Sequence, residues 1–198
     1  MSKSGRSYVS TRDRGPRRAD ILPGVSQSGA PTHPLVAVYP GSFDPFTRGH
    51  LELVERASKI FDHVIVAIGK HPRKPGIFSV EERCRLIRES VTGMPNVEAA
   101  AFDGLVVRFC RERGASVILR GLRAVGDFEP EFRMGMANRD LAPEIETMFL
   151  LTRPEMQFVS SSLVREIASH GGEFERYVTP PVAAALRERL GLSGGPGA

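Results

Sequence analysis

The chain contains no tryptophan and only two cysteines among its 198 residues. Cys84 and Cys110 stand at apolar helical positions far apart in the sequence, so they predict core thiols of a reducing compartment rather than a disulfide framework or a metal site. No apolar run is long enough to cross a membrane, and the N-terminus lacks the apolar segment of a secretory signal. We therefore expect a soluble, cytoplasmic protein with no membrane partner.

An excess of positive charge is confined to the N-terminal segment. Residues 1–34 hold six Lys or Arg and two Asp, which leaves 21 basic and 21 acidic residues in the rest of the chain. A domain with balanced charge does not favour a nucleic-acid partner. Residues 1–34 have few large apolar side chains and predict a disordered basic tail, with a nucleic-acid or partner-binding arm as the alternative. Residues 192–198 predict a flexible C-terminal end.

Five short apolar runs alternate with amphipathic segments between residues 35 and 191. The runs lie at residues 35–38, 64–68, 97–102, 117–119 and 148–151. Helical spacing follows each of them, with a weak point at Gly135 in the segment 128–141 and with Leu105 and Val106 turned inward in the segment 105–113. This alternation predicts an α/β fold: one Rossmann-like doubly wound domain with a five-stranded parallel sheet, all of whose strands are buried.

The clearest functional signal is the sequence LVAVYPGSFDPFTRGH at residues 35–50. Its apolar strand breaks at Pro40–Gly41, a polar turn follows, and a helix begins near His50. Backbone N–H groups and a helix N-terminus point outward together at such a turn, which suits a phosphate group. His50 can donate to a phosphate oxygen, although a histidine at a helix start can also be a cap or a solvated residue. Asp44 is interpreted as a turn-forming residue rather than a metal ligand.

Cationic and hydroxyl groups follow the ends of the other strands. Lys74 follows the second strand, Arg120 and Arg123 follow the fourth, and three serines, Ser160–Ser162, follow the fifth. The carboxyl ends of parallel strands meet at one edge of the sheet, so these groups predict a single site for a ligand with several phosphates. The alternatives are a solvated Lys74 and serines that only cap a helix. Arg120, which leaves a buried strand, requires an anionic partner.

The same set of residues favours phosphoryl or nucleotidyl transfer over other chemistry. Such reactions depend on positioning and on charge stabilisation, which His50, Arg120 and the Gly41 turn can supply. The sequence shows no Ser-His-Asp triad and no metal-ligand spacing of Asp and His.

Three sequence blocks carry a resemblance to a known family. YPGSFDPFTRGH at residues 39–50 resembles the first motif of the nucleotidyltransferases with an [HT]-x-G-H signature. RGLRAVGDFE at residues 120–129 and FVSSSLVRE at residues 158–166 are similar to blocks of the bacterial phosphopantetheine adenylyltransferase family. The resemblance covers about residues 35–191. A related enzyme with another acceptor, such as nicotinate mononucleotide, and a regulatory nucleotide-binding module without catalysis are the alternatives.

The resemblance implies a defined reaction and defined partners. The adenylyl group of ATP would pass to 4′-phosphopantetheine by direct in-line attack, giving dephospho-coenzyme A and pyrophosphate in coenzyme A biosynthesis. Mg²⁺ would be carried on the ATP phosphates, because the sequence shows no cluster of carboxylates to hold it. The family also implies a homohexamer and inhibition by coenzyme A at the same pocket.

The resemblance further implies roles for individual residues. His50 would hold the α-phosphate and stabilise its transition state, and Ser42 would touch both substrates. Lys74 and Arg120 would bind the phosphate of phosphopantetheine, and Leu105 and Val106 would contact its pantetheine arm. The ATP-binding residues implied are Ser42, Phe43, His50, Gly121, Leu122, Arg123, Glu131, Met156, Gln157, Phe158, Val159, Ser160, Ser161 and Ser162. The chain departs from the family at Arg48, where asparagine is more usual.

Overall fold

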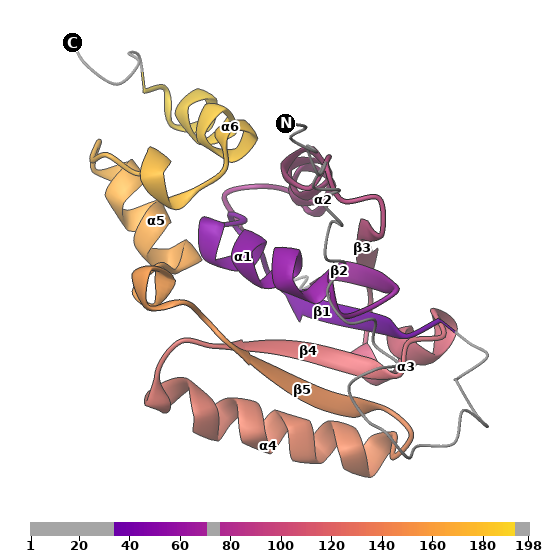
Figure 1. The fold of residues 1–198 in the computed structure, drawn as a ribbon. Coiled ribbons are helices and arrows are strands. Elements are labelled where there is room, and N and C mark those ends of the chain that lie inside the picture. The colour runs from indigo at the N-terminus through magenta and orange to yellow at the C-terminus, as the bar shows by residue number, and fades with distance from the viewer. Residues whose placement is uncertain (1–33, 71–75, 193–198) are drawn as a thin grey trace, which may run out of the picture. The chain divides into compact units, whose positions relative to one another are not determined.

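The structure is a computed structural model that describes residues 34–70 and 76–192 (Figure 1). In chain order its elements are β1 (Val36–Gly41), α1 (Arg48–Ala57), β2 (His63–Gly69), α2 (Val80–Ser90), β3 (Val97–Phe102), α3 (Val106–Glu112), β4 (Val117–Leu122), α4 (Val125–Leu141), β5 (Glu146–Leu151), the 3-10 turn η2 (Pro154–Met156), α5 (Ser161–Ser169), the 3-10 turn η3 (Glu175–Tyr177) and α6 (Pro180–Leu190). Residues 1–33 and 193–198 lie outside the described residues, so the proposed division into tail, domain and C-terminal end stays a prediction. None of the described helices is both long and apolar enough to span a membrane.

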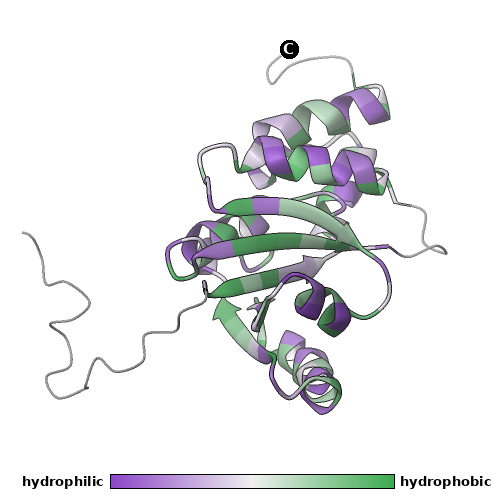
Figure 2. Cartoon of the chain, turned by 90° about the vertical axis from the view of Figure 1, so that its right-hand side faces the viewer, coloured by the Kyte–Doolittle hydropathy of each residue, from purple (hydrophilic) through white to green (hydrophobic). Residues whose placement is uncertain are grey.

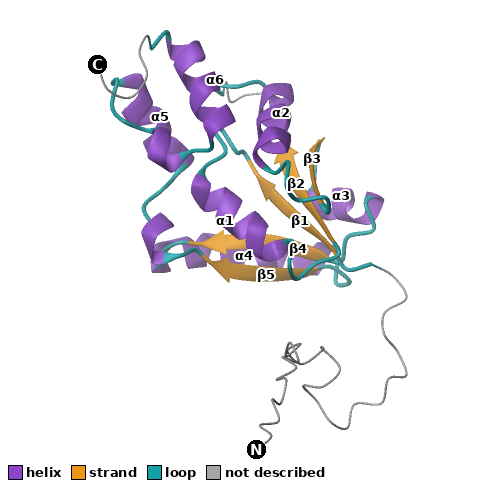
Figure 3. Ribbon diagram, turned by 45° about the horizontal axis from the view of Figure 1, so that its top comes forward, coloured by secondary structure: helices purple, strands orange, loops and turns teal. Residues whose placement is uncertain are grey.

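The five strands form one parallel sheet in the order β3-β2-β1-β4-β5 (Figure 3). The chain moves outward from β1 to β3 and then returns to the other side of β1 with β4. The reversal between β1 and β4 is the topological switch point, where ligands bind beyond the carboxyl ends of the strands. The predicted doubly wound parallel sheet is confirmed, and the switch point lies at the turn that begins after Gly41.

Both faces of the central strands are buried, which explains their continuous apolar sequences. Along β1, Ala37 and Tyr39 pack on the side of α1, α2, α5 and α6, whereas Val36 and Val38 pack on the side of α3. The central strands are accordingly coloured as largely hydrophobic in Figure 2. The two cysteines occur in different halves of this core, both buried and both free, which confirms the prediction of core thiols.

The sequence predictions were wrong about burial at two places. β5 was expected to be a buried strand, but Met148 and Leu151 are 41% and 70% exposed because β5 is the last strand of the sheet. Leu105 was expected to face inward, but it is 58% exposed because it is the N-cap residue and precedes the first turn of α3.

Strands β1 and β4 are longer than the apolar runs indicated. β1 continues through Pro40 and Gly41, which pair with Ala67 and Ile68 of β2. Proline lacks an N–H, but the Pro40 carbonyl oxygen still takes part in a hydrogen bond: it accepts from Arg120 Nη1 at 2.8 Å.

Helix α4 begins at Val125 and continues without a break through Gly135, the predicted weak point.

Candidate active site

The turn after β1 is held in an unusual backbone conformation by aromatic packing. Phe43 has φ = 47°, in the left-handed region that side chains other than glycine seldom adopt. Its ring packs edge-on against Tyr39 and His50, with centroid distances of 5.2 and 5.1 Å. A Cβ on Gly41 would lie 2.7 Å from the Phe43 ring, so only glycine fits there. Aromatic packing therefore defines the shape of this turn.

His50 is both a helix cap and a residue of the cavity wall. The Thr47 hydroxyl accepts from His50 N at 3.4 Å, and His50 Nδ1 accepts from the Thr47 N–H at 3.0 Å, which forms a capping box at the start of α1. Because Nδ1 is an acceptor in this bond, the proton of the neutral ring is on Nε2. The site therefore holds an oriented Nε2–H donor, and the two interpretations of His50, cap and phosphate donor, are compatible.

The surroundings of His50 keep its imidazole neutral. Burial beside Phe43 and Phe46, with repulsion from the Arg123 charge as a second cause, lowers the pKa of His50 to about 4. At neutral pH the ring is thus a hydrogen-bond donor through Nε2–H and carries no charge.

Folding stability should therefore fall because of His50 as the pH drops from 6.5 to 4. The unfolded imidazole has a pKa near 6.5 and the folded one about 4, so the unfolded chain binds more protons in this window and stability rises with pH. We expect His50 to account for about 3 kcal/mol across the window. Urea unfolding of the wild type and of His50→Gln at pH 7 and pH 4 measures this contribution. An equal loss of stability in both proteins would contradict the lowered pKa.

The structure brings most of the predicted site residues around one cavity of about 290 Å³. The cavity lies beyond the carboxyl ends of β1 and β4, next to the first turns of α1 and α5. The predicted residues that line it are Ser42, Phe43, His50, Arg120, Gly121, Arg123, Met156, Val159, Ser160 and Ser161. Four residues of the predicted phosphate-binding stretch also line it: Pro40, Gly41, Thr47 and Gly49. The lining residues that sequence reasoning missed are Tyr39, Leu53 and Thr152. Thr152 follows directly after the last residue of β5, and this position was a signal available in the sequence, whereas Tyr39 lies inside β1 and carried no such signal.

Other predicted residues do not line this cavity. They are Leu105, Val106, Leu122, Glu131, Gln157, Phe158 and Ser162. Phe158 is 57% exposed and packs edge-on against Tyr177. Lys74 lies outside the described residues. The roles that the resemblance implies for these residues stay predictions.

Arg120 has the anionic partner that its position at the end of a strand required. Its Nε and Nη2 each donate to Glu131 of α4 at 2.5 Å, and both side chains are largely buried. This bidentate pair, with the bond to the Pro40 carbonyl, fixes the guanidinium at the edge of the cavity. Arg123 pairs with Asp127 at 3.2 Å.

The serine triplet begins α5. Ser160 is the N-cap residue, and its hydroxyl accepts from Leu163 N at 3.1 Å, so the predicted capping role is confirmed. Ser161 Oγ instead donates to the Pro45 carbonyl at 2.8 Å and ties α5 to the turn after β1. The first turn of α5 therefore presents its N–H groups beside the cavity, an arrangement that suits an anion.

A buried carboxylate holds the segment before α5 against α1. Glu52 accepts from Arg56 at 3.2 Å and pairs with Arg153 at 3.0 Å. Arg56 also donates to the Leu151 carbonyl at 2.6 Å. Met156, three residues after Arg153, lines the cavity. These contacts set the position of one cavity wall relative to the helix that begins at His50.

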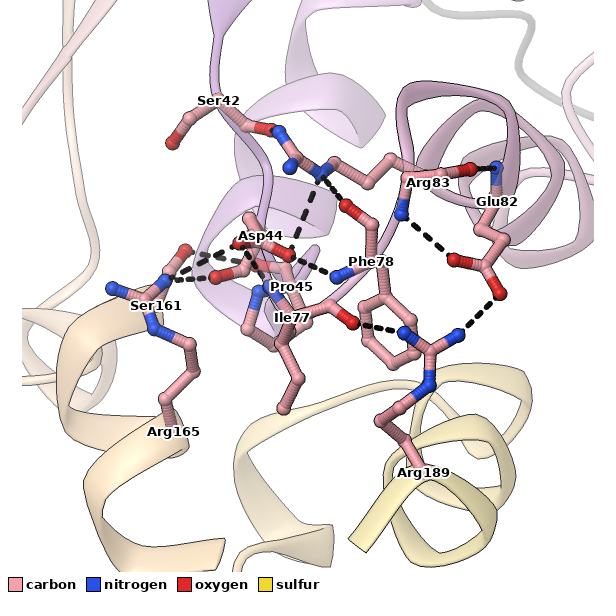
Figure 4. Close-up of polar contacts among 11 residues, drawn as sticks. Ser42, Asp44, Pro45, Ile77, Phe78, Glu82, Arg83, Ser161, Arg165 and Arg189 are labelled. Carbon is pink, nitrogen blue, oxygen red and sulfur yellow. Dashed lines mark hydrogen bonds and ion pairs between the residues drawn. The ribbon is translucent and has the colours of Figure 1, made fainter. Parts of the chain in front are cut away.

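Asp44 connects the turn after β1 to distant parts of the chain (Figure 4). Its carboxylate accepts from the N–H groups of Ile77 and Phe78 at 2.9 and 3.1 Å and pairs with Arg83 at 3.4 Å and Arg165 at 3.9 Å. The sequence interpretation of Asp44 as a local turn former missed these partners, because they lie 33 to 121 residues away along the chain. Asp44 is an anchor that joins the β1–α1 turn to the segment before α2 and to α5.

Asp44→Asn should lower the free energy of unfolding by roughly 2 to 4 kcal/mol. Asparagine has nearly the same shape, but it lacks the charge that faces Arg83 and offers one acceptor oxygen instead of two. Chemical denaturation measures the effect, with Asp140→Asn at an exposed position of α4 as the matched control. Equal shifts for the two variants would contradict the anchoring role.

Comparisons with known proteins agree with this geometry. Residues 38–167 match the cytidylyltransferase-like family. The phosphopantetheine adenylyltransferase of Thioalkalivibrio sulfidiphilus is 52% identical over 157 residues, which cover 79% of this chain and 99% of that protein. The protein of the same name from Desulforudis audaxviator is 49% identical over 159 residues, which cover 80% of this chain and 98% of the relative.

Solved structures show the same fold at low sequence identity. A putative nicotinate-nucleotide adenylyltransferase from Vibrio parahaemolyticus has a TM-score of 0.55 at 17% identity, over 76% of this chain and 97% of that one. A bifunctional NMN adenylyltransferase/ADP ribose pyrophosphatase from Francisella tularensis has a TM-score of 0.64 at 16% identity, over 81% of this chain and 51% of that one. About half of the aligned residues are identical to those of the two phosphopantetheine adenylyltransferases, over almost the whole length of both relatives, so the chain belongs to the phosphopantetheine adenylyltransferase family, within the cytidylyltransferase-like nucleotidyltransferases.

Proposed function

We propose that the protein transfers the adenylyl group of ATP to 4′-phosphopantetheine and releases dephospho-coenzyme A and pyrophosphate, a step of coenzyme A biosynthesis. The observation that carries the proposal is His50, a neutral, oriented Nε2–H donor in a cavity that also contains Arg120 and the start of α5. The choice of 4′-phosphopantetheine as the acceptor substrate is supported by the names of the similar proteins, which are phosphopantetheine adenylyltransferases. These groups offer hydrogen bonds and positive charge to phosphates, as direct nucleotidyl transfer requires.

In this mechanism the phosphate of phosphopantetheine attacks the α-phosphorus of ATP. The new P–O bond forms as the bond to the departing pyrophosphate breaks, and negative charge is spread over the α-phosphate oxygens. His50 Nε2–H donates to one of these oxygens, and the N–H groups at the start of α5 favour the same charge. Arg120 holds the attacking phosphate and Arg123 the nucleotide. Leu105, which is 58% exposed, offers apolar surface to the pantetheine arm together with Val106.

Mg²⁺ is proposed to enter on the phosphates of ATP. Within residues 34–70 and 76–192 no group of three or more His, Cys, Asp or Glu is placed to hold a metal ion. The polar side chains of the cavity wall are cationic, hydroxylic or imidazole groups, a donor set that suits phosphate rather than Mg²⁺. When bound, the ion neutralises phosphate charge, and the residues of the chain position the phosphates.

Assembly into a homohexamer and inhibition by coenzyme A at this cavity are part of the proposal. α4 and β5 expose apolar side chains that an isolated chain would leave in water, which supports self-association. They include Val125 (93% exposed), Phe128 and Phe132 (48% each) and Leu151 (70%). A cytoplasmic location is supported by the two free thiols, Cys84 and Cys110.

The test is pyrophosphate release from ATP and Mg²⁺ with and without 4′-phosphopantetheine, with nicotinate mononucleotide as the control acceptor. Release that depends on phosphopantetheine and yields dephospho-coenzyme A is the expected result. Release with nicotinate mononucleotide alone would overturn the substrate. ATP binding without release in either case would indicate a regulatory module.

A further inference from the structure

The hydroxyl of Tyr39 belongs to a largely buried side chain, but the oxygen itself is not sealed inside the protein. Tyr39 is 6% exposed, and its hydroxyl lies 3.6 Å from the position that a Cβ on Gly121 would occupy, between β1 and β4. Among the residues that the structure describes, none forms a hydrogen bond with this hydroxyl. The hydroxyl oxygen is therefore available for a hydrogen bond with a molecule in the cavity.

The Tyr39 hydroxyl belongs to the wall of the cavity described above. Arg120, Arg123 and His50 line the same cavity, and the Tyr39 ring lies edge-on to the His50 ring at a centroid distance of 6.4 Å. Burial raises the pKa of Tyr39 well above its ordinary value, against the opposing effect of the two arginines. The hydroxyl therefore keeps its proton at neutral pH and can donate it to a ligand.

A second hydroxyl on the same wall is also unpaired. Thr152, just after β5, is 6% exposed, and its Oγ1 has no hydrogen-bond partner among the described residues. Thr152 Oγ1 has almost no accessible surface, so the Tyr39 hydroxyl is the one that an occupant of the cavity can reach beside the cluster of Arg120 and Arg123. Because the cluster is cationic, the oxygen atoms of a phosphate fit it best.

We propose that the Tyr39 hydroxyl donates a hydrogen bond to an α-phosphate oxygen of ATP, which makes Tyr39 a further catalytic residue of the transfer. The assignment rests on the proposed function, since it needs ATP in this cavity. The bond strengthens as negative charge develops on the α-phosphate oxygens, so it acts on kcat as well as on ATP binding.

The test is Tyr39→Phe, which removes one oxygen atom and keeps the ring. We expect kcat/KM for ATP to fall about 10-fold, the magnitude of one hydrogen bond to a charged group. The melting temperature should stay the same, because the hydroxyl forms no hydrogen bond with the residues that the structure describes. Tyr177→Phe is the matched control: Tyr177 is 8% exposed and lies outside the cavity wall, and its variant should keep wild-type kinetics.

Two results would overturn the assignment. A kcat/KM for Tyr39→Phe within twofold of the wild type would mean that only an ordered water meets the hydroxyl. A loss of activity that accompanies an equal loss of melting temperature would mean a purely structural role. If the wild type shows no phosphopantetheine-dependent release, the proposed function fails separately. Calorimetry of ATP with both proteins then decides on Tyr39: weaker binding by Tyr39→Phe supports the contact, and equal binding overturns it.

Discussion

His50→Ala is expected to lower the turnover of adenylyl transfer by about 10²- to 10³-fold while the fold is retained, since this is the usual effect of removing one positioned donor from a developing oxyanion. The structure identifies the ring nitrogen of His50 that can donate to the substrate. Thr47 N–H occupies His50 Nδ1, so only Nε2–H can reach an α-phosphate oxygen. Steady-state kinetics measure turnover, and circular dichroism checks the fold.

His50→Ala should also lower the free energy of unfolding, because it removes the side chain that completes the capping box of α1. Alanine at this position removes the acceptor of the Thr47 N–H, which is worth about 1 kcal/mol of stability. His170→Ala, at the exposed C-cap of α5, is the matched control and should keep wild-type turnover. Near-normal turnover of His50→Ala would refute the catalytic role.

A pH profile distinguishes a neutral donor from a general base. With a pKa of about 4, His50 does not change its charge between pH 6 and 8, so turnover should show no inflection from His50 in that range. A change of turnover with an apparent pKa near 6.5 that is present in the wild type and absent from His50→Gln would show that the imidazole titrates during catalysis. That result would contradict the structure.

The sequence predicts those parts of the site that depend on local patterns. Gly41, His50 and Ser160 are each set by a turn or a helix start, and periodicity together with capping rules locates such points to within a residue or two. The position of Arg120 after a buried run indicated a partnered cation, and the structure supplies Glu131. Alternation of strands and helices was sufficient to predict the parallel sheet.

Other features depend on contacts between distant segments, which no local pattern contains. Asp44 looks like a turn residue in the sequence, yet its carboxylate is bonded to Ile77 and Phe78. In the sequence, Tyr39 looks like one more apolar residue of a strand. Only the fold shows that its hydroxyl lies at the cavity wall. The exposure of Leu151 follows from the place of β5 at the sheet edge, which is set by strand order rather than by composition.

Arg120→Ala should weaken the binding of 4′-phosphopantetheine by roughly 30- to 150-fold and the binding of ATP much less. A bidentate guanidinium contact with phosphate is worth about 2 to 3 kcal/mol, which corresponds to that range of Kd. Isothermal titration calorimetry with each substrate measures the two losses. Arg133→Ala, an exposed arginine of α4 that pairs with Glu129, is the control and should bind both substrates normally.

The pair with Glu131 adds a second, more specific expectation. Without Arg120, the Glu131 carboxylate stands uncompensated near the phosphate site and repels the ligand, so part of the loss comes from Glu131 rather than from the missing guanidinium. The double variant Arg120→Ala/Glu131→Gln should therefore bind phosphopantetheine more tightly than Arg120→Ala alone, and their difference measures the repulsion. An equal loss of affinity for both substrates in Arg120→Ala, or no recovery in the double variant, would mean that the 2.5 Å pair holds β4 and α4 together and does not present Arg120 to phosphopantetheine.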